Sequence, residues 1–171
     1  MVEEKEESMD LRVIKTKKNI REAFLELRRK HSLDEIKVTT LCEKAMVNKT
    51  TFYNHYQDIY ELSKELEKEV LDNFFHNFKD IDMLLIDANR FINGMHGVLE
   101  TENDMMRILF HDKMDELIER IEKDIRKYYA KGEQMLISFL IGGTIHLMFK
   151  SKNNNREVEE FLVEVITKIT K

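Results

Sequence analysis

The chain has 171 residues, with no proline, five glycines and one cysteine; 42% of its residues are apolar, 36% are charged, and the net charge is −5. The shortage of proline and glycine disfavours strand-and-turn architectures, and the lone Cys42 excludes an intramolecular disulfide. No apolar run reaches membrane-spanning length and the first residues are acidic, unlike a signal peptide, so we expect an all-α, cytoplasmic protein without a membrane segment.

Charge is distributed unevenly along the sequence. Residues 10–57 hold eleven Lys or Arg and six Asp or Glu, a net +5, whereas residues 58–171 carry −7 and residues 1–9 carry −3. A basic segment followed by an acidic one is typical of a protein that presents one end to a polyanion.

The basic segment predicts three helices. Apolar residues at helical spacing predict an amphipathic helix over residues 10–30 with a basic solvent face, after a flexible acidic tail over residues 1–9. The period restarts over residues 38–45, a helix of about two turns, and again over residues 49–56, where Phe52 and Tyr56 face the core.

Capping residues mark the ends of these short helices. Thr40 and Glu43 have the spacing of a capping box, and Asn48 is a good N-cap for the third helix. The residues from Met46 to Lys49 suffice only for a tight turn.

The rest of the chain predicts further helices. Asp58 and Glu61 form a cap-like pair that opens a long fourth helix, and residues 80–100 and 103–129 predict two more, separated at residues 101–104. A very apolar helix follows Gly132, and after the link SKNNNR a last amphipathic helix ends the chain. The apolar residues of the fourth helix recur every four positions: Leu62, Leu66, Val70, Phe74 and Phe78.

Two short helices joined by a tight turn, on a basic first helix, predict a helix-turn-helix DNA reader. A recognition helix must enter a major groove about 12 Å wide and meet base edges and phosphates with hydrogen-bonding side chains. Lys and Arg around it supply the counterion-release contribution to binding. The third helix offers suitable groups at Thr50, Thr51, Tyr53, Asn54 and His55.

The same segment resembles the DNA-binding domain of the TetR family of bacterial transcriptional regulators. Ile20, Ala23, Phe24 and the stretch VTTLCEKAMVNKTTFYNHYQDIYEL carry the resemblance, above all its Thr-Phe-Tyr-x-His-Tyr core. It implies a three-helix DNA-binding domain over residues 1–56 and a helical dimerisation and effector-binding domain over residues 57–171. The contact residues implied are Thr39, Thr40, Lys49, Thr50, Thr51, Tyr53, Asn54 and His55.

Three positions depart from the family pattern. Met46 replaces the glycine of the turn, which requires either a left-handed Met or a different turn. Thr50 replaces a glycine on the recognition helix, and Ile59 replaces a lysine that commonly contacts phosphate.

The resemblance is weaker after about residue 65, where it implies a dimer formed by the last two helices and a pocket for a small-molecule effector. For the dimer interface we expect Phe139, Gly142, Gly143, His146, Phe161, Leu162 and Val165. Methionines adapt to irregular cavities but also fill ordinary cores, so the residues expected to line the pocket are about equally well explained as ordinary core residues. The pocket residues expected are Phe91, Met95, Met106, Phe110 and Met114.

The leading hypothesis is a homodimeric repressor that binds a pseudo-palindromic operator and is released by an effector. The alternative is a co-regulator on the same fold, whose body binds a partner protein and whose head binds DNA weakly or only in that complex. No phosphate loop, nucleophile elbow or metal-ligand cluster occurs in the sequence, so we expect no enzymatic activity, cofactor or metal.

Overall fold

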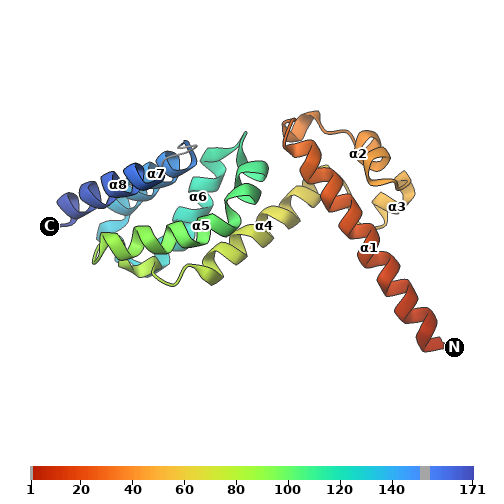
Figure 1. The fold of residues 1–171 in the computed structure, drawn as a ribbon, viewed down its shortest axis with the longest axis horizontal. Coiled ribbons are helices and arrows are strands. Elements are labelled where there is room, and N and C mark those ends of the chain that lie inside the picture. The colour runs from red at the N-terminus through yellow and green to blue at the C-terminus, as the bar shows by residue number, and fades with distance from the viewer. Residues whose placement is uncertain (1, 151–154) are drawn as a thin grey trace. The chain divides into compact units, whose positions relative to one another are not determined.

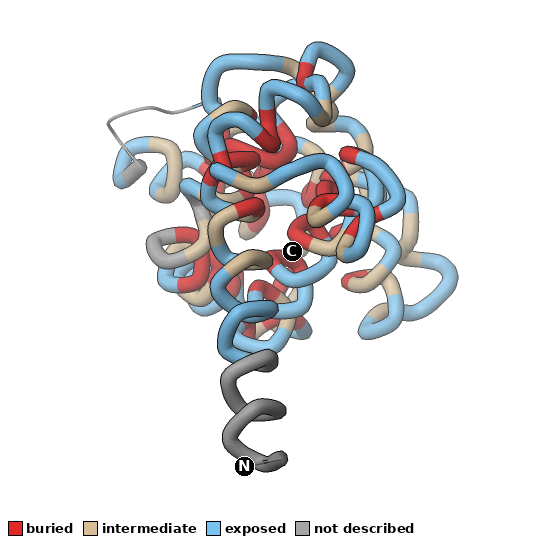
Figure 2. The backbone as a smooth tube through the Cα atoms, turned by 90° about the vertical axis from the view of Figure 1, so that its right-hand side faces the viewer, coloured by how far each residue is buried: buried red, intermediate tan, exposed pale blue. Residues whose placement is uncertain are grey.

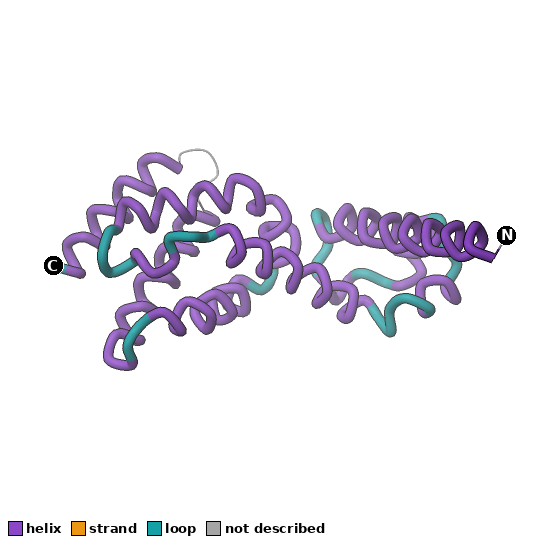
Figure 3. Tube along the Cα trace, turned by 90° about the horizontal axis from the view of Figure 1, so that it is seen from below, coloured by secondary structure: helices purple, strands orange, loops and turns teal. Residues whose placement is uncertain are grey.

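The computed structural model describes residues 2–150 and 155–171. These two ranges form helices and connecting turns with no strand, which confirms the all-helical prediction (Figures 1 and 3). None of the helices within them combines the length and the apolar character needed to cross a membrane. The chain divides into two compact units, residues 1–68 and 69–171, so the boundary lies later than the predicted one between residues 56 and 57.

The first unit packs its helices around one small core. Its most deeply buried apolar side chains are contributed by every helix of the unit, and Figure 2 marks the buried positions of the chain in red. These side chains are Ile20, Phe24, Leu41, Phe52, Tyr56, Leu62 and Leu66. The elements are α1 (Val2–Arg28), the short 3-10 turn η1 (Leu33–Glu35), α2 (Val38–Ala45), α3 (Lys49–Tyr53) and the first half of α4 (Ile59–Asn77).

Helix α1 begins at Val2, eight residues before the expected start at residue 10. The prediction of a tail over residues 1–9 was therefore wrong for residues 2–9, which are helical. Glu and Lys dominate this segment and both have high helix propensity, while acidic residues near a helix N-terminus also interact favourably with the helix dipole.

Helix α2 has the predicted bounds but not the predicted cap. Its N-cap is Lys37, which makes no side-chain capping bond, and Thr40 is the third residue of the helix. The capping box of Thr40 and Glu43 was therefore wrong, because the helix starts three residues earlier than this pair implies.

Helix α3 is shorter than predicted, since it ends at Tyr53 instead of Tyr56. The N–H groups of His55 and Tyr56 both donate to the carbonyl of Phe52, at 2.9 and 3.0 Å, and this tightens the chain into a turn. Tyr56 nevertheless keeps its predicted place in the core, with 2% of its surface exposed.

The start of α4 confirms the predicted pair of Asp58 and Glu61. Asp58 Oδ1 accepts the N–H of Glu61 at 2.8 Å, and Glu61 Oε2 accepts the N–H of Gln57 at 2.5 Å. Asp58 thus satisfies a backbone donor in the first turn of α4, and Glu61 satisfies that of Gln57, two residues before the helix begins. The apolar residues predicted for this helix are all buried, although Phe78 lies one residue beyond the end of α4: Leu62, Leu66, Val70, Phe74 and Phe78.

The second unit is a bundle in which α5 packs against α8, and α6 and α7 pack against each other. The predicted break at residues 101–104 was wrong, because α5 continues to Phe110 and the chain leaves the helix at residues 111–113. Residues 101–104 are polar, but buried apolar residues recur at helical spacing on both sides of them, from Met95 to Leu109. This packing holds residues 101–104 in the helix. After the second half of α4 come η2 (Ile81–Met83), α5 (Ala88–Phe110), α6 (Met114–Ile125), η3 (Arg126–Tyr128), η4 (Lys131–Glu133), α7 (Gln134–Lys150) and α8 (Asn155–Thr170). Residues 151–154 of the predicted link lie outside the described residues.

Candidate nucleic-acid interface

The turn between α2 and α3 depends on a left-handed residue, Met46, with φ 54° and ψ 42°. The N–H of Met46 donates to the carbonyl of Glu43 at 3.2 Å, and the N–H of Val47 donates to that of Cys42 at 3.0 Å. These bonds close the C-terminus of α2 and reverse the chain. Of the two conformations expected for a turn without glycine, the structure therefore has the left-handed Met.

Helix α3 starts at a side-chain cap. Asn48 Oδ1 accepts the backbone N–H of Thr51 at 2.7 Å, which confirms the predicted N-cap. Phe52, with no exposed surface, anchors the opposite side of the helix in the core, and its ring meets that of Tyr53 edge-on at 5.4 Å between centroids. The remaining side chains of α3 are therefore held at the surface.

The eight predicted contact residues lie in α2 and in the segment from α3 to the turn that follows it. Six of them are exposed, and Thr51 and His55 are half-buried. Tyr53, the largest of the set, leaves 55% of its surface exposed although it is aromatic. The exposed six are Thr39, Thr40, Lys49, Thr50, Tyr53 and Asn54.

Some of the basic residues of this unit are engaged by carboxylates and others are not. Lys18 lies 3.8 Å from Glu22, and Lys44 pairs closely with Glu26, so that the hydrogen bond and charge of Lys44 lower the pKa of the Glu26 carboxyl. Lys49 is exposed at the start of α3 and makes no ion pair within the described part of the chain. It is therefore a cation available to an external anion.

Two residues of α4, Ile59 and Glu65, have surroundings that the sequence did not reveal. Ile59 is 5% exposed and is therefore a core residue. Glu65 contacts α1 and Tyr56, which ends the turn after α3, and sequence reasoning missed it because nothing in its local spacing distinguishes it from the other acids of α4.

The residues expected to line an effector pocket are packed into the core of the second unit. Phe91, Met106 and Phe110 have no exposed surface, Met95 is 1% exposed, and Met114 is half-buried. None of them lines the hollow of about 360 Å³ between α5 and α8, whose lining includes Asn89, Asn93, Glu159 and Glu160. The effector pocket stays a prediction.

The residues expected at a dimer interface divide into exposed and buried members. Phe139 and Phe161 leave 68% and 54% of their surfaces exposed, and Gly143 and His146 are also exposed. Gly142 and Val165 are half-buried, whereas Leu162, at 4%, belongs to the core of the unit.

Comparison of the chain with protein-family models, curated proteins and solved structures returned no match. A search of the described residues also found no cluster of three or more side chains that could hold a metal ion.

Proposed function

We propose that this protein is a DNA-binding regulator of transcription of the TetR type, a homodimer that places α3 of each copy in the major groove of a pseudo-palindromic operator. The observation that carries the proposal is the surface of α3. A helix of five residues, joined to α2 by a tight turn, exposes Lys49, Thr50 and Tyr53 and is followed by the exposed Asn54.

The chemistry of this surface fits both parts of DNA recognition. Hydroxyl, amide and phenol groups can donate to and accept from base edges and phosphate oxygens, and so fix the register of the protein on the duplex. Lysines and arginines on the same unit release counterions from the phosphates and supply affinity. Because Ile59 is buried, fewer cations than in the usual family pattern would contribute.

Two apolar stripes support a second copy as the partner of the second unit. Helix α7 exposes the side chains of Met135 and Phe139 and then Gly143 at helical spacing, and α8 exposes Phe161 and Ile169. Helices α7 and α8 pack against each other (Figure 1). Large exposed apolar side chains gathered on neighbouring elements mark interaction surfaces. A symmetric dimer formed there would present two α3 helices, which a helix-turn-helix dimer places about 34 to 36 Å apart.

In this proposal the dimer represses a promoter by occupying it, and a small molecule bound by the second unit releases it. Release requires that the effector bind two conformations of that unit with different affinity.

The experiment that tests the function is the binding of the purified full-length protein to the DNA upstream of its own gene and to an unrelated duplex, at several salt concentrations. We expect preference for the upstream DNA and a log-log salt dependence of about −0.9 per phosphate neutralised. Equal and weak binding to both duplexes contradicts the proposal.

A matched pair of variants locates the interface. Tyr53→Ala removes a tyrosine that is 55% exposed on α3, and Tyr128→Ala removes one that is 57% exposed in the second unit. We expect the first to abolish the preference for the upstream DNA and the second to leave it intact. An unchanged preference in Tyr53→Ala contradicts the placement of the interface on α3.

The alternative function, a co-regulator that binds a partner protein, is favoured by the same apolar stripes and by the burial of Ile59. In that case Phe139 and Phe161 contact a different protein instead of a second copy. A monomeric protein that binds DNA without sequence preference would favour this alternative.

A further inference from the structure

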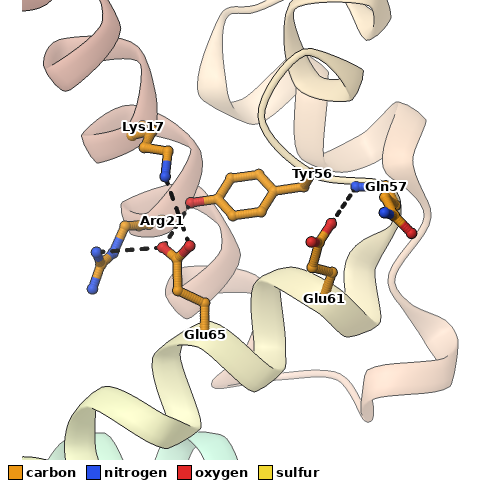
Figure 4. Close-up of polar contacts among 6 residues, drawn as sticks. All are labelled: Lys17, Arg21, Tyr56, Gln57, Glu61 and Glu65. Carbon is orange, nitrogen blue, oxygen red and sulfur yellow. Dashed lines mark hydrogen bonds and ion pairs between the residues drawn. The ribbon is translucent and has the colours of Figure 1, made fainter.

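Glu65 on α4 connects three elements of the first unit. Its Oε1 accepts a hydrogen bond from the Tyr56 hydroxyl at 3.1 Å and lies 3.7 Å from Arg21 Nη1, while its Oε2 lies 3.7 Å from Lys17 Nζ (Figure 4). Lys17 and Arg21 belong to α1, and Tyr56 ends the turn that follows α3. One carboxylate therefore contacts both the basic first helix and the end of the α3 segment.

Burial makes the phenol part of this cluster hard to rearrange. Tyr56 is 2% exposed, and its ring also lies beneath Lys17, whose Nζ is 5.4 Å from the ring centroid. Burial, and then the charge of Glu65 and the hydrogen bond to it, raise the pKa of Tyr56 well above its ordinary value. The phenol therefore stays a hydrogen-bond donor at any physiological pH.

The side of the cluster that faces α1 has a different character. The side chains of Lys17, Arg21 and Glu65 are 40%, 29% and 37% exposed, so both cations retain a path to solvent. Ion pairs as long as 3.7 Å in partly exposed positions are weak, and a phosphate can compete with the carboxylate for the same cations. Glu65 thus restrains two positive charges without burying them.

We propose that Glu65 is a positioning residue for specific DNA recognition. It fixes the end of the α3 segment through Tyr56, and at the same time it occupies Lys17 and Arg21, so that these cations do not drive sequence-independent binding. This inference depends on the proposed function. It states that one side chain, Glu65, sets the ratio of the affinity for operator DNA to the affinity for other DNA.

Three variants separate the two roles of the cluster. Glu65→Gln keeps the size of the side chain and an acceptor for the Tyr56 hydroxyl but removes the negative charge. Tyr56→Phe keeps the ring and the charge of Glu65 but removes the hydrogen bond. The matched control is Glu22→Gln, which removes one negative charge from the same unit at an exposed pair with Lys18, outside the cluster.

The test measures the affinity of each full-length variant for the upstream DNA and for an unrelated duplex over a range of salt concentrations. If Glu65→Gln frees Lys17, the salt slope on the unrelated duplex steepens by about 0.9, the value for one phosphate contact, and the ratio of specific to non-specific affinity falls about tenfold. Tyr56→Phe lowers the ratio without steepening the slope, and Glu22→Gln leaves the ratio unchanged. A wild-type ratio in both Glu65→Gln and Tyr56→Phe overturns the proposal, and so does an equal fall in Glu22→Gln.

A measurement without DNA keeps this inference distinct from the proposed function. The amide protons of His55 and Tyr56, which bond to the Phe52 carbonyl, should exchange with solvent about tenfold faster in Tyr56→Phe than in Glu22→Gln. If the wild type shows no preference for the upstream DNA, the proposed function fails. Faster exchange then still supports Glu65 and Tyr56 as the restraint on the α3 segment, and unchanged exchange overturns it. If Glu65→Gln does not fold, Tyr56→Phe, which keeps the charge, decides both measurements.

Discussion

Asn48 Oδ1 and the backbone N–H of Thr51 form a hydrogen bond of 2.7 Å across the first turn of α3. Because α3 has only five helical residues, this single cap satisfies a large share of the donors that the start of the helix leaves open. A helix so short is not stable by itself in water, so its cap and its buried Phe52 must maintain it.

Replacement of Asn48 by Ala should lower the free energy of unfolding by about 1 kcal/mol, because the Thr51 N–H loses its partner. Asn48→Ser is the control, since a serine oxygen can accept the same bond and should cost much less. Chemical denaturation followed by circular dichroism measures both variants. If Ala and Ser have the same effect, the cap contributes little to the stability of α3.

Met46→Gly should raise the stability of the protein by about 1 kcal/mol. Met46 has a φ of 54°, a conformation that costs a residue with a Cβ atom more than it costs glycine. Its side chain is 89% exposed, so the substitution removes almost no packing. Met46→Ala, which keeps the Cβ atom, should remain close to the wild type in the same denaturation measurement. A loss of stability in Met46→Gly would mean that the exposed side chain makes a contribution that the structure does not explain.

Local signals in the sequence were sufficient for much of the first unit. The apolar period placed α2 over its observed range, and the chemistry of Asn48 and Asp58 predicted two caps that the structure contains. These features depend on residues that are neighbours in the chain, and for that reason a pattern of spacing reveals them. Tyr53 is exposed as expected, because Phe52 occupies the core-facing position beside it.

Features that depend on tertiary contacts were not predictable in the same way. The polar stretch within α5 looks like a linker, and only the packing of the helix on both sides of it keeps it helical. Glu65 is one acid among several on α4, and its contacts with Tyr56 and Arg21 appear only once α1 and α4 are packed together. The left-handed Met46 could be expected from a missing glycine, but the choice between strain and a different turn required the structure.

Tyr129→Phe should destabilise the second unit and change its response to alkaline pH. The Tyr129 hydroxyl accepts the N–H of Leu84 at 3.0 Å and donates to the carbonyl of Ile81 at 2.8 Å, so its loss leaves both backbone groups without this partner, at a cost of about 1 to 3 kcal/mol. The exposed Tyr128, replaced by Phe, is the matched control and should have little effect.

The pH dependence follows from the pKa of Tyr129, which burial raises to about 12. Below pH 10 both the folded and the unfolded chain keep the proton, so this group does not make the stability change with pH. Between pH 10 and 12 the unfolded chain ionises first, and stability should fall by at most about 1.4 kcal/mol per pH unit on account of this residue. Urea denaturation at several alkaline pH values should therefore give a shallower decline for Tyr129→Phe than for the wild type and for Tyr128→Phe. Equal declines in all three would contradict a raised pKa.

Gly143→Leu tests whether α7 pairs with a second copy of the chain. A Cβ atom at Gly143 meets nothing within 4 Å among the described residues, so a side chain can leave the backbone there without a clash at its first atom. Gly97→Leu is the matched control, because Gly97 is also an exposed helical glycine with no neighbour within 4 Å. In sedimentation velocity we expect the wild type and Gly97→Leu to be dimers. The overpacked interface of Gly143→Leu should dissociate roughly 5- to 150-fold more readily, because overpacking costs about 1 to 3 kcal/mol. An intact Gly143→Leu dimer would place the interface away from this face of α7, whereas a monomeric wild type would contradict the dimer and favour a partner protein on the exposed Phe139 and Phe161.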